Sequence, residues 1–189
     1  MTWPLFPAFL KLKGRPVVLV GGGTVATNKL QALLEAGARV TVVAPEVSAE
    51  IKAAEVTIHN REFKPTDLEQ AWLVVAAAPP DVNRRVAEAA KLKQLFVNAV
   101  DDPQHASVYL GGVVRRGGVT VAISTDGRAP ALAGLIREAF ERLLPESEVQ
   151  RWLETADTQR AQWTMNAIPM NERRPLLWRA LAALYDDRE

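Results

Sequence analysis

Apolar and polar residues follow a strand-then-helix order over the first hundred positions. The apolar run at residues 17–20 and the run at residues 40–43, which only Thr41 interrupts, are typical of parallel strands covered on both faces. Between these runs, residues 25–36 place apolar side chains at helical spacing. Gly37 then provides a natural helix end. The pattern predicts a strand, a helix and a second strand in this order.

Three further strands are expected at residues 56–58, 73–78 and 95–100, with a helix at residues 82–92 between the last two. Strands that alternate with helices favour a parallel sheet with helices on both faces. The fold class predicted for this part of the chain is therefore α/β, with a Rossmann-like, doubly wound parallel sheet.

The pattern changes after Asp101. Residues 107–114 and 119–124 are expected to form two strands, joined by a hairpin at residues 115–118. A helix over residues 131–144 should follow. These elements predict a small α+β segment beside the larger sheet.

Two more helices are expected after Pro145, the second beginning near Asn171. Tryptophans at helical spacing along them are expected in the core, namely Trp152, Trp163 and Trp178. The two changes of pattern divide the chain into residues 1–101, 102–145 and 146–189.

The first strand runs directly into a glycine-rich turn and a helix. The spacing Gly21-x-Gly23-x-x-Ala26 is the dinucleotide-binding fingerprint, in which glycines allow a tight turn and close approach of backbone to a diphosphate. Free N–H groups at the helix start would face that charge. The expected cofactor contacts are Gly21, Gly22, Gly23, Thr24, Val25 and Ala26. A glycine-rich turn that binds no ligand shares this local pattern.

The ends of the other strands supply further candidates. Pro45 and Glu46 follow the second strand and are expected cofactor contacts. No arginine pair lies beside them to bind a 2′-phosphate, which favours NAD over NADP as the cofactor. Ala77, in the fourth predicted strand, and Asn98, in the fifth, are also expected cofactor contacts, although Asn98 could serve a structural role.

Asp101 ends the fifth strand, at the carboxyl edge where open sheets bind their ligands. A carboxylate there could accept a proton from a substrate that loses a hydride. Asp101-Asp102-Pro103 is also a natural turn sequence, so a capping role is the alternative.

Composition narrows the function classes. The 189-residue chain has 48% hydrophobic and 24% charged residues, and its net charge of +1 implies no electrostatic attraction to nucleic acid or membrane. It has no cysteine, which excludes disulfides and thiolate chemistry and favours a cytoplasmic location. We expect no signal peptide, because residues 1–10 lack a basic lead. Two histidines and no cysteine form no metal-binding motif.

Several stretches carry a family resemblance that covers residues 4–145. They are Pro4-Leu5-Phe6, Leu12-Lys13-Gly14-Arg15, the fingerprint, Val42-Val43-Ala44-Pro45-Glu46, Asn83-Arg84-Arg85-Val86-Ala87, Asn98-x-Val100-Asp101-Asp102-Pro103, and residues 122–133. In these stretches the chain resembles the precorrin-2 dehydrogenase and sirohydrochlorin ferrochelatase family, the siroheme synthase N-terminal type.

This resemblance implies NAD-dependent dehydrogenation of precorrin-2 to sirohydrochlorin in siroheme biosynthesis, with Asp101 as the proton acceptor. It also implies a homodimer formed through the central segment, and a second activity with Fe²⁺ as a substrate of chelation. Two alternatives remain open: a non-catalytic NAD-binding redox sensor, and a dehydrogenase of another polycarboxylate.

The implied tetrapyrrole substrate bears many carboxylates, which suit arginine side chains. The expected substrate contacts are Arg115, Arg128, Ser124, Thr125 and His105. Each has a simpler alternative: the arginines could be solvated, the hydroxyls could cap the next helix, and His105 could be an ordinary loop residue.

Overall fold

The computed structural model describes residues 4–186. The chain divides into two compact units, Met1–Leu110 and Gly111–Glu189. The strands of the first unit are β1 (Pro16–Val20), β2 (Arg39–Val43), β3 (Thr57–His59), β4 (Leu73–Ala76) and β5 (Phe96–Ala99). Its helices are α1 (Thr24–Glu35), α2 (Ala49–Ala53), the short 3₁₀ helix η1 (Pro65–Leu68) and α3 (Pro80–Leu92).

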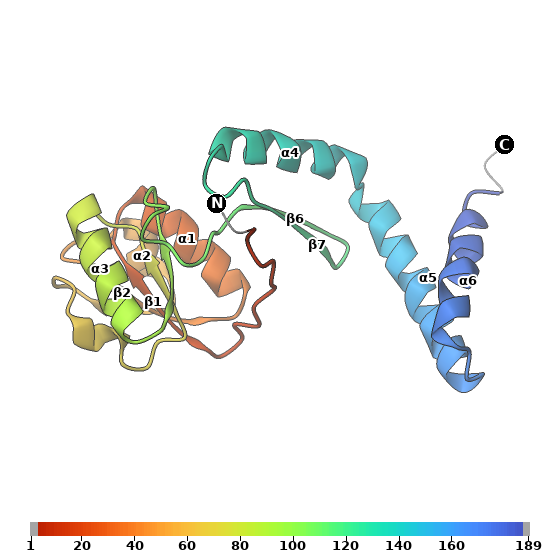
Figure 1. The fold of residues 1–189 in the computed structure, drawn as a ribbon, viewed down its shortest axis with the longest axis horizontal. Helices are drawn as coiled ribbons and strands as arrows, with labels where there is room; N and C mark the ends of the chain where they lie inside the picture. The colour runs from red at the N-terminus through yellow and green to blue at the C-terminus, as the bar shows by residue number, and fades with distance from the viewer. Residues whose placement is uncertain (1–3, 187–189) are drawn as a thin grey trace. The chain divides into compact units, whose positions relative to one another are not determined.

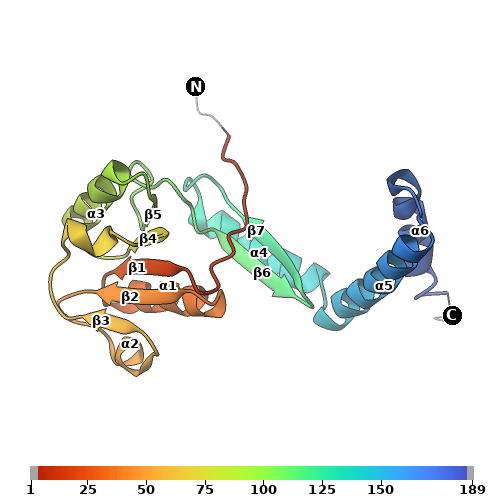
Figure 2. The same ribbon diagram turned by 90° about the horizontal axis from the view of Figure 1, so that it is seen from below.

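All five strands are parallel, in the order β3-β2-β1-β4-β5 (Figure 2). Each face of the sheet has its own apolar core. One core is formed with α1 and α2, and the other with α3 and η1. The predicted doubly wound parallel sheet is therefore confirmed. The strand order reverses at β1 and β4, so the carboxyl ends of these two strands flank the crevice where such sheets bind ligands.

The segment after β5 differs from the sequence prediction. Residues 107–111 are not part of a strand, because Ser107 and Val108 turn back onto β5. Both of their backbone N–H groups donate to the carbonyl of Val97, at 2.8 and 3.0 Å. The strand predicted from residue 107 therefore begins only at Gly112.

In the second unit, β6 (Gly112–Arg116) and β7 (Val119–Ile123) form an antiparallel hairpin. The helices are α4 (Pro130–Leu143), which packs on the hairpin, α5 (Glu146–Met165) and α6 (Met170–Ala182). The helices α5 and α6 lie side by side (Figures 1 and 2). The hairpin turn is only Gly117–Gly118, and Arg115 and Arg116 belong to β6.

The expectation for the three tryptophans is wrong at Trp178, which is 76% exposed. Within this unit α6 packs against α5 and has no buried residue, so its far face is open. Trp152 is half-buried, and its indole N–H donates to the Tyr185 hydroxyl at 2.6 Å. In the part of the chain that is described, no helix has both the length and the apolar character needed to cross a bilayer.

Candidate functional site

The turn between β1 and α1 contains two glycines that have no room for a side chain. Gly21 adopts φ +127°, and a Cβ there would collide with the backbone carbonyl of Ala77. A Cβ on Gly22 would collide with the carbonyl of Glu46. These two glycines let the turn pack directly against the loops that follow β4 and β2.

Gly23 is in a different environment, since nothing lies within 4 Å of the position of its missing Cβ. It is the N-cap of α1, which has no side-chain cap and no acidic residue in its first turn. The first N–H groups of a helix have no partner inside the helix and favour an anion. The residues present at Gly23, Thr24 and Val25 therefore fit the diphosphate of a dinucleotide.

The loop after β2 lies beside this turn. The N–H of Ser48 donates to the Gly22 carbonyl at 2.8 Å. The hydroxyl of Ser48 accepts from the N–H of Ile51 at 3.2 Å and lies 2.9 Å from the Thr27 hydroxyl. Pro45 and Glu46 are both exposed. The end of β2 is thus fixed against the glycine turn, with a carboxylate side chain in solvent.

A cavity of about 180 Å³ lies at the carboxyl ends of β4 and β5. It connects the first turn of α1 to the loop after β5, and it therefore brings three predicted site residues together: Val25, Ala77 and Asp101. The remaining lining residues are Ala78, Pro80, Asn83, Val100 and Asp102.

Asn83 was assigned no role from the sequence, yet its side chain crosslinks two walls of this cavity. Its Oδ1 accepts from the N–H of Ala78 at 2.9 Å, and its Nδ2 donates to the Val100 carbonyl at 3.3 Å. The residue is only 3% exposed. The signal in the sequence was a polar residue on the inner face of an amphipathic helix.

Asp101 has a left-handed backbone, with φ +57°, and an exposed side chain. The loop that follows is braced internally. The two carboxylate oxygens of Asp102 lie 2.7 and 2.8 Å from His105 Nδ1, and the Tyr109 hydroxyl donates to the Pro103 carbonyl at 3.1 Å. Asp101 is thus presented at the start of an ordered loop.

The side-chain amide of Asn98 anchors the end of this loop, where the chain packs back against β5. Its Nδ2 donates to the Val108 carbonyl at 2.9 Å, while its buried Oδ1 has no partner among the described residues. It is 7% exposed and is not among the described residues that line the cavity with Asp101. This placement favours a structural role over direct contact with the cofactor.

The predicted substrate residues of the second unit have local partners of their own. The Ser124 hydroxyl accepts from the N–H of Asp126, and the Thr125 hydroxyl accepts from the N–H of Ala129, both at 3.2 Å. Both hydroxyls therefore stabilise the turn before α4. Arg115 and Arg128 are exposed.

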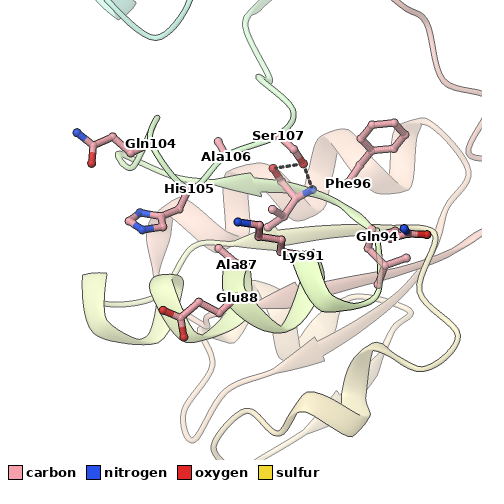
Figure 3. Close-up of a pocket in the computed structure, with 11 residues that line it drawn as sticks. Ala87, Glu88, Lys91, Gln94, Phe96, Gln104, His105, Ala106 and Ser107 are labelled. Carbon is pink, nitrogen blue, oxygen red and sulfur yellow. Dashed lines mark hydrogen bonds between the residues drawn. The ribbon is translucent and has the colours of Figure 1, made fainter.

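His105 lies on a second cavity of about 640 Å³, between α3 and residues 104–107 (Figure 3). This cavity shares no described lining residue with the one beside Asp101. Among residues 4–186, no three His, Asp or Glu side chains gather into a group that could hold a metal ion.

The sheet, the switch point and the open helix start define a dinucleotide-binding α/β protein. A family model described as "Putative NAD(P)-binding" matches residues 8–112, and one described as "Sirohaem biosynthesis protein central" matches residues 116–143. The chain therefore belongs to this NAD(P)-binding family, and the predicted resemblance to the siroheme synthase N-terminal type is confirmed.

Curated relatives agree with this assignment. Siroheme synthase 1 of Aeromonas salmonicida is 41% identical over 182 residues, which cover 94% of this chain and 39% of the relative. Siroheme synthase 3 of Aeromonas hydrophila is 44% identical over 147 residues, which cover 74% of this chain and 31% of the relative. The chain thus spans well under half the length of these relatives.

A solved structure described as SirC, precorrin-2 dehydrogenase, has a TM-score of 0.73 and 29% sequence identity to this chain. The match covers 97% of this chain and 91% of that one. The similarity therefore extends over both units and includes the helices of the C-terminal part.

Proposed function

We propose that this chain is an NAD-dependent dehydrogenase that converts precorrin-2 to sirohydrochlorin in siroheme biosynthesis. The observation that carries the proposal is that one cavity joins the start of the anion-binding helix, at Val25, to the carboxylate of Asp101. A dehydrogenase needs these two groups together, because a hydride acceptor and a proton acceptor must reach one substrate. Similarity to a precorrin-2 dehydrogenase over 97% of the chain supports the choice of substrate.

Each turnover moves one hydride and frees one proton. Bound NAD⁺ supplies the hydride acceptor. The backbone N–H groups of residues 22–26 would hold the diphosphate, and Gly23 leaves the space that it needs. Gly21 would contact the cofactor without its N–H, which donates to the Val43 carbonyl at 3.0 Å. Asp101 accepts the proton as a general base. Asn83 fixes the loop that carries Asp101 by holding the Val100 carbonyl.

We propose NAD rather than NADP as the cofactor. Glu46 is exposed beside the glycine turn, where its carboxylate can accept from a ribose hydroxyl and would repel a 2′-phosphate. Pro45 precedes Glu46 in the same exposed loop, and the Ala77 carbonyl lies against Gly21, so both remain proposed cofactor contacts. A comparison of the NAD and NADP dissociation constants tests this choice.

We propose that the carboxylates of the tetrapyrrole are bound by basic and hydroxyl groups. The exposed guanidinium groups of Arg115 and Arg128 suit carboxylates. Ser124 and Thr125 keep their hydroxyl protons available as donors, because both accept backbone N–H groups. We also propose His105 as a substrate contact, as the sequence predicts. Its side chain lines the cavity next to α3.

We propose a nucleotide domain at residues 1–101, a central segment at residues 102–145 and a helical domain at residues 146–189. We propose that the chain forms a homodimer through the central segment. The two-stranded sheet of β6 and β7 has free edges, which invite pairing. On α4, the side chains of Leu132, Leu135 and Leu143 are exposed. Sedimentation at tens of micromolar tests this, since twice the 20.7 kDa chain mass is expected.

We propose iron insertion as a separate second step, with Fe²⁺ as a substrate. Asp101 could then take the pyrrole protons that the metal displaces. Adding Fe²⁺ to the sirohydrochlorin product and following its spectrum distinguishes an enzyme with both activities from a dehydrogenase alone.

The main test is incubation of the protein with precorrin-2 and NAD, following the tetrapyrrole spectrum and the NADH absorbance together. Formation of sirohydrochlorin and NADH in equal amounts is the expected result. NAD binding without turnover would instead support a redox-sensing module. Turnover of another polycarboxylate, with none of precorrin-2, would contradict the proposed substrate.

A further inference from the structure

Two hydroxyl groups connect the glycine turn to the loop that follows β2. Thr27, near the start of α1, donates from its hydroxyl to the Gly23 carbonyl at 3.1 Å. The Ser48 hydroxyl lies 2.9 Å from the Thr27 hydroxyl. Ser48 is also the N-cap of α2, where its hydroxyl accepts from the N–H of Ile51 at 3.2 Å. Thr27 and Ser48 thus form a hydroxyl bridge between the start of α1 and the start of α2.

The direction of these hydrogen bonds follows from their acceptors. A carbonyl oxygen can only accept, so the single hydrogen of the Thr27 hydroxyl is used at Gly23. Ser48 then supplies the hydrogen between the two hydroxyls. The exposed Glu50 carboxylate competes for that hydrogen: its own backbone N–H, followed by the Ser48 hydroxyl, lowers the pKa of Glu50. The bond from Thr27 to Gly23 does not depend on this competition.

We propose that Thr27 and Ser48 are positioning residues that hold the glycine turn in the shape that binds the diphosphate of NAD. The inference rests on the proposed dehydrogenase function. Ser48 holds the Gly22 carbonyl through its backbone N–H at 2.8 Å, and Thr27 holds the Gly23 carbonyl. In a trans peptide, a carbonyl and the N–H of the next residue point in opposite directions. Anchoring these two carbonyls therefore turns the N–H groups of Gly23 and Thr24 the other way, toward the proposed diphosphate site.

Gly23 needs this support more than the two glycines that precede it. Those two are confined by the carbonyls of Ala77 and Glu46, whereas no described atom beyond the chain neighbours lies within 4 Å of the missing Cβ of Gly23. A glycine in open space has a wide choice of backbone conformations. The apparent affinity of a site falls with the fraction of molecules that hold the binding shape. The hydroxyl bridge therefore favours NAD binding by limiting the conformations of Gly23.

The decisive variant is Thr27→Val, which keeps the shape of the side chain and removes its hydroxyl. The dissociation constants of NAD and of ADP-ribose should both rise by about threefold to tenfold, the effect of losing one hydrogen bond. The two factors should agree, because both ligands carry the diphosphate. Thr27→Ser keeps the hydroxyl and should bind both ligands like wild type. Calorimetric titration measures these constants without any turnover.

A second variant, Ser48→Ala, removes the other hydroxyl of the bridge and should raise both constants in the same direction. The matched control is Thr164→Val in α5, where the Thr164 hydroxyl donates to the Arg160 carbonyl at 3.0 Å, also four residues earlier. This control removes the same kind of hydrogen bond away from the glycine turn. It should leave both dissociation constants unchanged.

The outcomes separate the hydroxyl bridge from the proposed function. Wild-type NAD affinity in Thr27→Val, a loss of affinity for NAD but not for ADP-ribose, or a Thr27→Ser variant as weak as Thr27→Val would overturn the positioning role and leave the dehydrogenase intact. If the wild-type protein binds NAD but does not oxidise precorrin-2, the proposed function fails while the positioning role stands. A wild-type protein that binds no NAD would overturn both.

Discussion

The two units bury their apolar residues to very different extents. In the first unit, the sheet has an apolar core on each face, with Leu19 and Val75 fully buried. In the second unit, the described apolar residues that are buried are only Val114, Ala133 and Val149. Large apolar side chains there remain exposed, such as Leu135 at 65% and Leu143 at 71%.

This difference in burial indicates that the two units have different roles. The first unit has enough buried surface to fold around its own core, and it holds the glycine turn and Asp101. The second unit buries few of its described apolar residues, as expected of an element that is completed by a partner. The comparison therefore supports placing cofactor chemistry in the first unit and self-association in the second.

The largest expected effect is on catalysis, from Asp101→Asn. Asparagine also tolerates the left-handed backbone at this position, so the fold should be retained. Dehydrogenation should fall by about 10²- to 10⁴-fold, because the variant has lost the base. The measurement is the single-turnover rate at saturating NAD.

The matched control for that variant is Asp126→Asn in the second unit. Asp126 also has a left-handed backbone, with φ +54°, but it has no assigned chemistry. It should keep the wild-type rate. Equal rates in Asp101→Asn and wild type would mean that Asp101 is a turn residue and that water takes the proton.

The second effect concerns stability, in a pair of leucine-to-alanine variants. Leu19→Ala in β1 should lower the free energy of unfolding by about 2–5 kcal/mol, because Leu19 is fully buried. Leu135→Ala on α4 removes exposed atoms, and it should weaken dimerisation more than it changes monomer stability. Denaturant titration and sedimentation measure the two effects. Equal losses of folding stability would contradict the contrast between the units.

The third effect concerns cofactor binding, in two adjacent glycines. Gly23→Val should raise the NAD dissociation constant by on the order of 100-fold, the loss of about 3 kcal/mol of charged hydrogen bonds. The variant should still fold, because its side chain enters open space. Gly22→Val should instead destabilise the fold by colliding with the Glu46 carbonyl. Calorimetric NAD titration and thermal melting separate the two outcomes.

The parallel sheet was predictable because its central strands β1 and β4 are continuous apolar runs, and helical segments separate the strands. The short helices α2 and η1 were not predicted, since five or four residues carry too little periodicity. The strand predicted from residue 107 was wrong because Val108 looks like a strand residue, yet its N–H bonds to Val97. A tertiary contact of this kind leaves no local pattern.

The site could be predicted only where chemistry depends on spacing. The fingerprint placed Val25 near the cavity, and the strand end placed Asp101 there as well. The sequence could not assign Asn83, because its partners Ala78 and Val100 lie on two separate loops. It also could not assign the Asp102–His105 pair, which depends on how one loop closes.

The smallest expected effect is on the pH dependence of stability, through Asp67 in the first unit. Its carboxylate accepts from both terminal nitrogens of Arg61, at 2.6 and 2.9 Å, and from the N–H of Lys64 at 2.8 Å. The hydrogen bonds from Arg61, followed by the one from Lys64, lower the pKa of Asp67, although partial burial opposes them. A lowered folded-state pKa stabilises the protein above the unfolded value of about 3.9.

That stabilisation should be lost as pH falls through the folded-state pKa of Asp67. Asp67→Asn should therefore cost about 1 kcal/mol of unfolding free energy near neutral pH, and progressively less in acid. The matched control is Glu141→Gln in α4, which breaks the 2.6 Å pair with Arg137 four residues earlier on an exposed helix. It should cost only about 0.3 kcal/mol. Denaturant titrations from neutral to acidic pH measure both variants, and a difference between Asp67→Asn and wild type that grows in acid would contradict the assigned direction.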